Sequence, residues 1–245
     1  MSATYLALEM RRVLRTPAFA VFTIGFPVVL LFLYSGIFTN DAENKQVALA
    51  IIMTSMCAFG GVTASLVTGT RAAEERHAGW QRQLRLTPLS GGGYLVAKVI
   101  VGMVVALGPI LLVALLGGLV QGVSLDAAGW LRVTLGVWLG MLPIALIGLF
   151  IGQTATADSV QAVTQAVMLL LTLIGGIFIP VDSMPGWLIN VSKVLPTYWI
   201  SQIARGAVTT DLSEGLGTAI LVLAAWTVVA GALVVRRYRR DSARV

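Results

Sequence analysis

Few side chains in this sequence are of the types that catalysis or metal binding requires. The chain contains one histidine, His77, and one cysteine, Cys57. A Ser-His-Asp triad needs a histidine held beside its nucleophile, whereas His77 stands in a charged segment between two apolar stretches. A structural zinc site needs several Cys or His ligands, and one thiol cannot form a disulfide within the chain. We therefore expect no catalytic residue and no metal site.

The motif that binds nucleotide phosphates is absent as well. The phosphate loop G-x-x-x-x-G-K-[ST] requires a glycine followed by a lysine, and no glycine in this sequence precedes a lysine. The three glycines 91–93 follow Thr87-Pro88 and are typical of a flexible linker. We therefore expect that the chain is not an enzyme and does not hydrolyse ATP.

The composition indicates a protein embedded in lipid. Hydrophobic residues make up 57% of the 245 residues and charged residues only 11%, whereas a soluble domain has about 25% charged residues. A globular surface must be wetted, so the deficit of charge excludes a soluble core of this size. The net charge of +6 does not indicate nucleic-acid binding, because the basic residues are separated by long uncharged stretches.

Six uncharged stretches are long enough to cross a bilayer, which requires about 20 apolar residues of helix. They cover residues 16–40, 46–70, 99–125, 133–157, 159–181 and 215–235. Pro27, Pro109 and Pro143 are tolerated inside them because neighbouring helices satisfy the freed carbonyls. The sequence predicts an all-α integral membrane protein with six transmembrane helices in a single domain, 1–245.

The basic residues indicate the orientation of these helices. With six spans, three arginine-rich clusters fall on one side of the membrane, and the other side keeps few basic residues. The clusters lie within 11–15, 71–98 and 236–244, and the residues opposite are Lys45, Arg132, Lys193 and Arg205. The positive-inside rule places the clusters, both termini and a basic tail, 236–245, in the cytoplasm.

An amphipathic helix is predicted before the first span. At helical spacing, Leu6, Met10, Val13 and Leu14 share one face of residues 1–16, and three arginines lie on the other. This pattern is typical of a helix in the inner interface of the bilayer. A plain cytoplasmic extension of the first span is the alternative, although Thr16-Pro17 favours a break between the two.

The segment 182–207 is apolar, but we do not expect it to span the membrane. Pro185 and Pro196 interrupt it, and Lys193 and Arg205 would each cost about 2.5–3.5 kcal/mol near the centre of the bilayer. Two short helices at the outer interface are predicted instead. Trp187, Tyr198 and Trp199 would anchor them at the level of the lipid headgroups.

The cytoplasmic loop between the second and third spans predicts a short amphipathic helix, from about residue 74 to 86. Glu74 and Glu75 would lie near its N-terminus, where the helix dipole favours acids. Trp80 and Leu84 are four residues apart and share a face, and Thr87-Pro88 ends the helix. From these residues alone, docking to a partner protein and resting on the membrane surface are equally supported.

Polar residues inside the spans suggest where a substrate path or a dimer seam could lie. The spans have no Asp, Glu, Lys or Arg away from their ends, which argues against a proton- or sodium-coupled carrier. Small and hydroxyl residues also pack helices together in lipid, so packing remains the alternative for both faces. For Gln161 and Gln165 a further alternative is contact with water, because they lie near the cytoplasmic end of the fifth span. The two candidate faces are Thr54, Ala58, Gly61, Ser65 and Thr68 in the second span, and Gln161, Gln165, Met168 and Thr172 in the fifth.

Two regions resemble the type-2 permease family of ATP-binding cassette (ABC) transporters, in the branch of small drug- and antibiotic-resistance exporters. The first comprises Glu74, Glu75, Arg76, Gly79, Leu84 and Thr87-Pro88-Leu89-Ser90; the second comprises Gly175, Gly176, Phe178, Pro180, Met184, Pro185, Gly186, Trp187, Leu195, Pro196, Tyr198 and Arg205. Trp80 departs from the small hydroxyl residue that is usual in this family after the glycine.

The resemblance implies that the first region is a coupling helix that docks into the ATPase, and that the second forms re-entrant helices at the outer face. It also implies a homodimer of permeases with two ATPase subunits, in the cell membrane of a bacterium. ATP and magnesium would be bound by the ATPase, and this chain would hold no cofactor. The expected function is export of a lipophilic or amphiphilic drug. Alternatives are an ABC permease for lipid or ions, a secondary carrier, or a membrane assembly subunit that transports nothing.

Overall fold

The computed structural model describes residues 21–39, 42–79, 91–209 and 215–242, and within them every regular element is a helix. The elements are η1 (Val21–Gly25), α3 (Phe26–Phe38), α4 (Lys45–His77), α6 (Gly91–Leu119), α7 (Ala127–Leu131), η2 (Arg132–Gly136), α8 (Val137–Thr154), α9 (Ala157–Ile174), η3 (Val181–Ser183), α10 (Gly186–Val194), α11 (Pro196–Thr209) and α12 (Leu216–Ser242). The interfacial helix predicted for residues 1–16 lies outside this part of the chain.

Six helices are long and apolar enough to cross a membrane, and each of them overlaps one predicted stretch. They are Val21–Phe38, Lys45–His77, Gly91–Leu119, Ala127–Thr154, Ala157–Ile174 and Leu216–Arg240. α4 ends at His77, seven residues after the predicted end of its stretch at residue 70. The helix continues because its charged residues lie where it leaves the lipid, and charge there does not end a helix. The all-α membrane fold with six candidate spans is confirmed.

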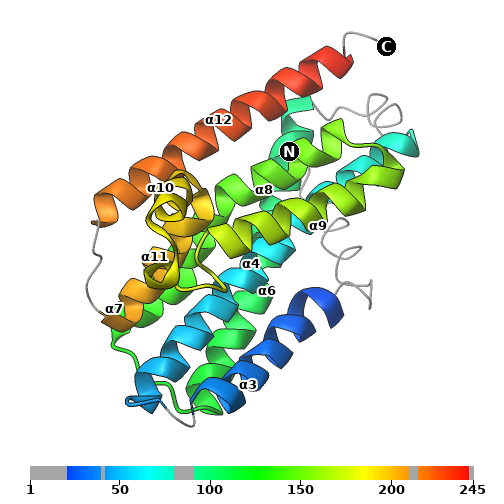
Figure 1. Cartoon of the computed structure of the whole chain (residues 1–245). Helices are drawn as coiled ribbons and strands as arrows, with labels where there is room; N and C mark the ends of the chain where they lie inside the picture. Colours follow the sequence, from blue (N-terminus) through cyan, green and yellow to red (C-terminus); the bar gives the residue numbers. More distant parts are fainter. Residues whose placement is uncertain (1–20, 40–41, 80–90, 210–214, 243–245) are drawn as a thin grey trace.

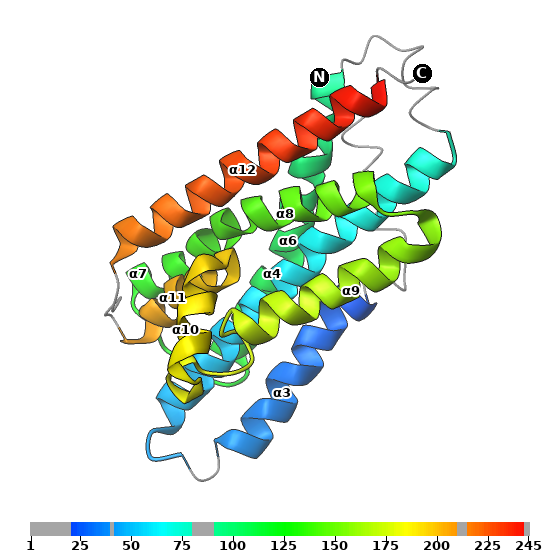
Figure 2. The ribbon, with the colours of Figure 1, turned by 45° about the horizontal axis from the view of Figure 1, so that its top comes forward.

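α4 is the central helix of the bundle. In its most apolar window 72% of the residues are buried, compared with 22% in α9 and 17% in α12. It packs most extensively against α8 and α6, and also contacts α3, α9 and α11. Figures 1 and 2 show α4 passing through the middle while α3, α9 and α12 lie on the outside. The outer helices are therefore the ones that meet lipid or partner chains.

Glycines allow α4 and α8 to pack with their backbones in contact. A Cβ atom on Gly69 of α4 would overlap the carbonyl of Gly148, and one on Gly152 would overlap the carbonyl of Gly69. On Gly148 it would lie 2.8 Å from the Leu66 carbonyl oxygen. Gly148 and Gly152 are four residues apart on α8, the small-xxx-small spacing that brings helices together in lipid. Dispersion between closely packed backbones therefore holds this helix pair.

We expect Gly69→Ala to lower the thermal stability of the detergent-solubilised protein, because overpacking typically costs about 1–3 kcal/mol and here the obstacle is backbone. Gly108→Ala is the matched control, since a Cβ there meets only the Ile24 side chain, at 3.6 Å. Tryptophan fluorescence during heating measures both variants. Equal melting temperatures for Gly69→Ala and wild type would show that the two helices separate at little cost.

The segment after α9 contains two α-helices, α10 and α11, as predicted, but the predicted position of two of its aromatic residues was wrong. Tyr198 and Trp199 are 2% and 3% exposed and form an edge-to-face pair with ring centroids 5.1 Å apart. They are buried because the chain folds back after Ile174 and α11 packs against α4, α8 and α12. Only Trp187, which is 67% exposed, remains a candidate for a headgroup anchor.

Candidate functional site

The acidic pair of the expected coupling helix belongs to the end of α4, not to the start of a new helix. α4 runs through Glu74 and Glu75 to His77. It ends because Gly79 takes a left-handed backbone conformation, with φ of 72°, and its N–H donates to the Arg76 carbonyl at 3.2 Å. The prediction of one helix from residue 74 to 86 is therefore wrong at its N-terminal end. Trp80 and Leu84 lie outside the described residues.

Glu75 forms a buried ion pair that joins α4 to the first turns of α6. Its carboxylate accepts a hydrogen bond from Lys98 Nζ at 2.7 Å, and both side chains are 5% exposed. The Tyr94 hydroxyl donates to the second carboxylate oxygen at 3.3 Å. The Tyr94 ring stacks on Tyr238 of α12, with centroids 6.2 Å apart. We call Glu75, Tyr94 and Lys98 the charged latch; it ties together the two helices that flank residues 80–90.

Arg76, the next residue, ties α4 to the turn between α8 and α9. Its guanidinium group donates to the carbonyls of Gln153 and Ala155. Carbonyls at the end of a helix have no partner within the helix, and the dipole there favours a cation. α9 begins directly afterwards, with Thr156 and Ser159 forming a capping box. A displacement of the end of α4 therefore reaches α6 through the charged latch and α9 through Arg76.

The charged latch can be tested with a double-mutant cycle. Glu75→Leu or Lys98→Met removes the 2.7 Å ion pair and leaves the other charge buried, and loss of one partner of a buried pair typically costs about 3–5 kcal/mol. Glu75→Leu combined with Lys98→Met removes both charges and should recover most of that loss. Denaturation of the purified protein, followed by tryptophan fluorescence, gives the three values. Additive losses in the double variant would show that the two residues do not interact.

The second predicted region is a buried turn whose carbonyls are bound by side chains. The chain reverses at Gly175 and Gly176, both buried, and Gly176 has a φ of 77°. Backbone outside a helix is tolerated at membrane depth only where protein groups satisfy it. The donors to this turn are Thr197 to Leu171 O (2.7 Å), Ser192 to Ile174 O (2.6 Å), Ser201 to Gly175 O (3.0 Å) and Arg205 to Gly176 O (2.6 Å).

The structure brings together only part of the predicted outer motif. Gly175, Gly176 and Arg205 meet at the turn, and Pro196 and Tyr198 are buried beside it in α11; Pro180, Pro185 and Trp187 are exposed. Ser192, Thr197 and Ser201 were not among the site residues predicted from the sequence. Thr197, Ser201 and Arg205 are spaced four residues apart and share one face of α11, so a search for polar stripes in segment 182–207 would have found Thr197 and Ser201. Ser192 lies on α10, outside this stripe.

Arg205 should stabilise the fold through its bond to Gly176. Arg205→Met removes a charged hydrogen-bond donor from the carbonyl of buried Gly176, a loss of about 1.5–3 kcal/mol. Lys45→Met is the control, because Lys45 is an exposed basic residue at the start of α4. Thermal unfolding in detergent should show a lower midpoint for Arg205→Met alone. The same small shift in both variants would contradict a capping role for Arg205.

The predicted polar face of the second span is buried inside the chain. Thr54 and Ser65 have no exposed surface, and a Cβ on Gly61 would lie 2.7 Å from the Met141 Cε atom of α8. Ala58 and Thr68 are buried as well. Of the alternatives open for this face, packing within one subunit is the one that its burial supports.

The predicted polar face of α9 is divided between two environments. Thr172 is buried, and Met168 packs toward α4, where the Thr63 hydroxyl lies 3.6 Å from its sulfur. Gln161 and Gln165 point outward from the bundle and are exposed, next to exposed Leu169, Leu170 and Leu173. An amide without a hydrogen-bond partner is costly in hydrocarbon. Gln161 and Gln165 on the outer face of α9 therefore need water or a protein group as a neighbour.

Comparison with known proteins identifies the family. The ABC-2 type transporter family matches residues 3–209, most of the chain, and this range includes the charged latch and the buried turn. A protein of Bacillus subtilis (strain 168), named "Putative transport permease YvfS", is 28% identical over 191 residues, covering 78% of this chain and 78% of that protein. The chain therefore belongs to the ABC-2 type transporter family, as a multi-pass membrane subunit of an ABC transporter whose ATP hydrolysis resides in a separate ATPase.

Proposed function

We propose that this subunit exports a lipophilic or amphiphilic compound, of the drug or antibiotic class, across the cell membrane. The observation that carries the proposal is the uncharged middle of the bundle. Among the described spans, ionisable side chains lie near the ends, and the most deeply buried pair, Glu75 and Lys98, is neutralised internally. Such a bundle offers no proton relay or ion site. It suits an apolar cargo better than an ion or a sugar; lipid export is the second candidate.

The distribution of charge supports an orientation with both termini in the cytoplasm of a bacterial cell. Arg71, Arg76, Lys98 and the arginines 236–240 lie at the end of the bundle where α4 and α12 end and α6 begins (Figure 1, upper right). By the positive-inside rule this end faces the cytoplasm. Six spans then return the C-terminus to the side of the N-terminus, within one transmembrane domain covering residues 1–245.

Two copies of the permease and two copies of the ATPase form the proposed transporter. The outward-facing Gln161 and Gln165 support this assembly, because a second subunit or a hydrated path between two subunits would give their amides partners. The outer face of α9 is thus proposed as path lining or dimer seam. ATP and magnesium are bound by the ATPase, and the permease itself holds no cofactor.

Coupling runs through residues 78–90, which connect α4 to α6. Trp80 and Leu84 supply the apolar groups that dock against the ATPase. Support for this comes from the anchored ends of the segment: the charged latch fixes α4 to α6, and Arg76 fixes α4 to the turn before α9. A push from the ATPase on this segment would therefore shift α4, α6 and α9 together, rather than bend one helix.

The function is tested by ATP-driven efflux from vesicles that contain the permease and its ATPase. Uptake of lipophilic antibiotics into inside-out vesicles should require ATP and should persist when an ionophore collapses the proton gradient. Trp80→Ala with Leu84→Ala should leave the permease inserted, weaken ATPase binding at least tenfold, and uncouple hydrolysis from transport, because truncated interface anchors cost about 2 kcal/mol or more.

The control for that variant is Leu119→Ala with Val120→Ala. These two side chains are 78% and 62% exposed at the opposite end of the bundle, so their truncation removes exposed apolar groups without touching the coupling segment. Transport driven by the proton gradient without ATP would refute the exporter. Normal ATPase binding and transport by the Trp80 and Leu84 variant would refute the coupling role alone.

A further inference from the structure

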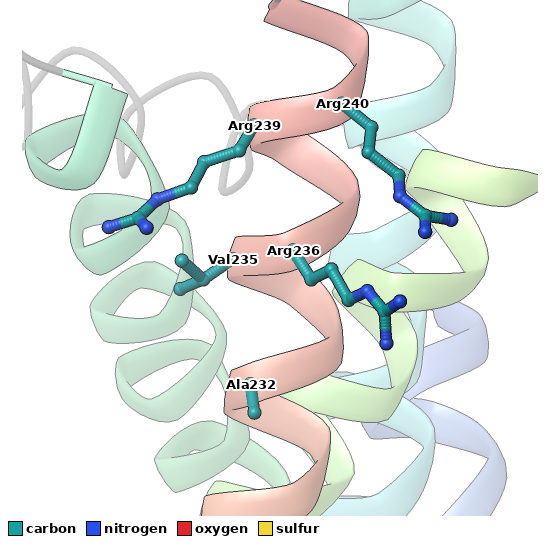
Figure 3. A pocket seen from close by; sticks show the side chains of 5 residues that line it. All are labelled: Ala232, Val235, Arg236, Arg239 and Arg240. Atoms are coloured by element: carbon teal, nitrogen blue, oxygen red, sulfur yellow. The ribbon is translucent and has the colours of Figure 1, made fainter.

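The end of α12 carries an open hollow with a basic rim and an apolar floor. Ala232, Val235, Arg236, Arg239 and Arg240 line it, and its volume is about 510 Å³. Figure 3 shows Arg239 extending to one side of α12 and Arg236 and Arg240 to the other, beyond the small side chains of Ala232 and Val235. We call these five residues the basic stripe.

The basic stripe follows from the helical repeat. Its residues recur at intervals of three and four, so they lie on one face of α12 over slightly more than two turns. All five are exposed. In the part of the chain that the structure describes, no acidic side chain pairs with Arg236, Arg239 or Arg240. Three guanidinium groups therefore remain available to an external anion.

The same face of α12 continues into the apolar surface of the span. α12 is the least buried of the six candidate spans, and Val228 and Leu221 are each 70% exposed. Val235, at the floor of the hollow, is 41% exposed. The arginines thus lie where an exposed apolar helix surface ends, which is the depth at which phospholipid headgroups lie beside a spanning helix.

We propose that the basic stripe binds an anionic phospholipid, with the headgroup phosphate on Arg236, Arg239 and Arg240 and an acyl chain along Ala232 and Val235. Arginine suits this role because its planar guanidinium group donates two parallel hydrogen bonds to phosphate oxygens. A cluster of basic residues at the end of a spanning helix attracts anionic lipid in general. The apolar floor favours a lipid over a soluble phosphate, which has no acyl chain to place there.

Spin-labelled lipids in vesicles that contain the whole permease measure this preference. The quantity is the association of spin-labelled phosphatidylglycerol relative to phosphatidylcholine, from the motionally restricted fraction of the spectrum. Wild type should prefer phosphatidylglycerol, and Arg236→Gln with Arg239→Gln and Arg240→Gln should lower the preference at least threefold. Lys45→Gln, at the opposite end of the bundle, should leave it unchanged.

Two further variants keep the test decisive if removal of three charges disturbs insertion. The triple change of these arginines to lysine keeps the charge, and should retain insertion while losing part of the preference. Ala232→Phe places a bulky ring on the floor of the hollow without changing charge and should lower phosphatidylglycerol association about twofold.

The proposal would be overturned by an unchanged lipid preference in the glutamine variant, whether or not that variant also loses ATPase binding. It would also be overturned if millimolar inorganic phosphate displaced the spin-labelled phosphatidylglycerol, because the arginines would then bind phosphate without a lipid. The lipid measurement needs neither ATPase nor substrate. It therefore succeeds or fails independently of the proposed export function.

Discussion

Hydrocarbon offers no hydrogen bonds, so every backbone carbonyl and N–H group within the bilayer must find its partner in the protein. Long helices meet this requirement over most of the chain, and the places where helices end inside the bundle are the places where other side chains intervene. Thr197, Ser201 and Arg205 of α11 bind the carbonyls at the turn after α9. Arg76 of α4 does the same at the end of α8.

This requirement also explains where charge is found. Charged side chains lie at helix ends, where they reach water, bind exposed carbonyls or pair with one another. The Glu75–Lys98 pair is buried at such an end, and its desolvation is offset by a short ion pair and the Tyr94 hydroxyl. Together with the glycine contact between Gly69 and Gly148, it makes α4, α6 and α8 a tightly connected unit. α3, α9 and α12 surround that unit and keep large exposed surfaces for lipid and partner chains.

Hydropathy and charge are local properties, and the sequence by itself therefore determined the class of the protein. It predicted the all-α fold, the six spans and two helices between the fifth and sixth spans, and its motifs indicated the family. It did not indicate where α4 ends, because acidic residues followed by an amphipathic pattern are typical of a helix start. The left-handed Gly79 places that end at His77, and nothing in the local pattern distinguished a capping glycine from one inside a helix.

Only the tertiary structure decided which apolar faces meet protein. α4 and α9 have mean hydropathies of 1.9 and 1.5, yet their buried shares are 72% and 22%. Lipid tails and a protein core are equally apolar, so hydropathy does not separate them. For the same reason Tyr198 looked like a headgroup anchor and is buried, and hydropathy left path, dimer seam and packing open for the polar face of α4, which is buried inside the subunit. The contacts between helices depend on small residues and on hydrogen bonds between residues far apart in the chain. Such long-range contacts exist only in the folded bundle, so a local sequence pattern does not reveal them.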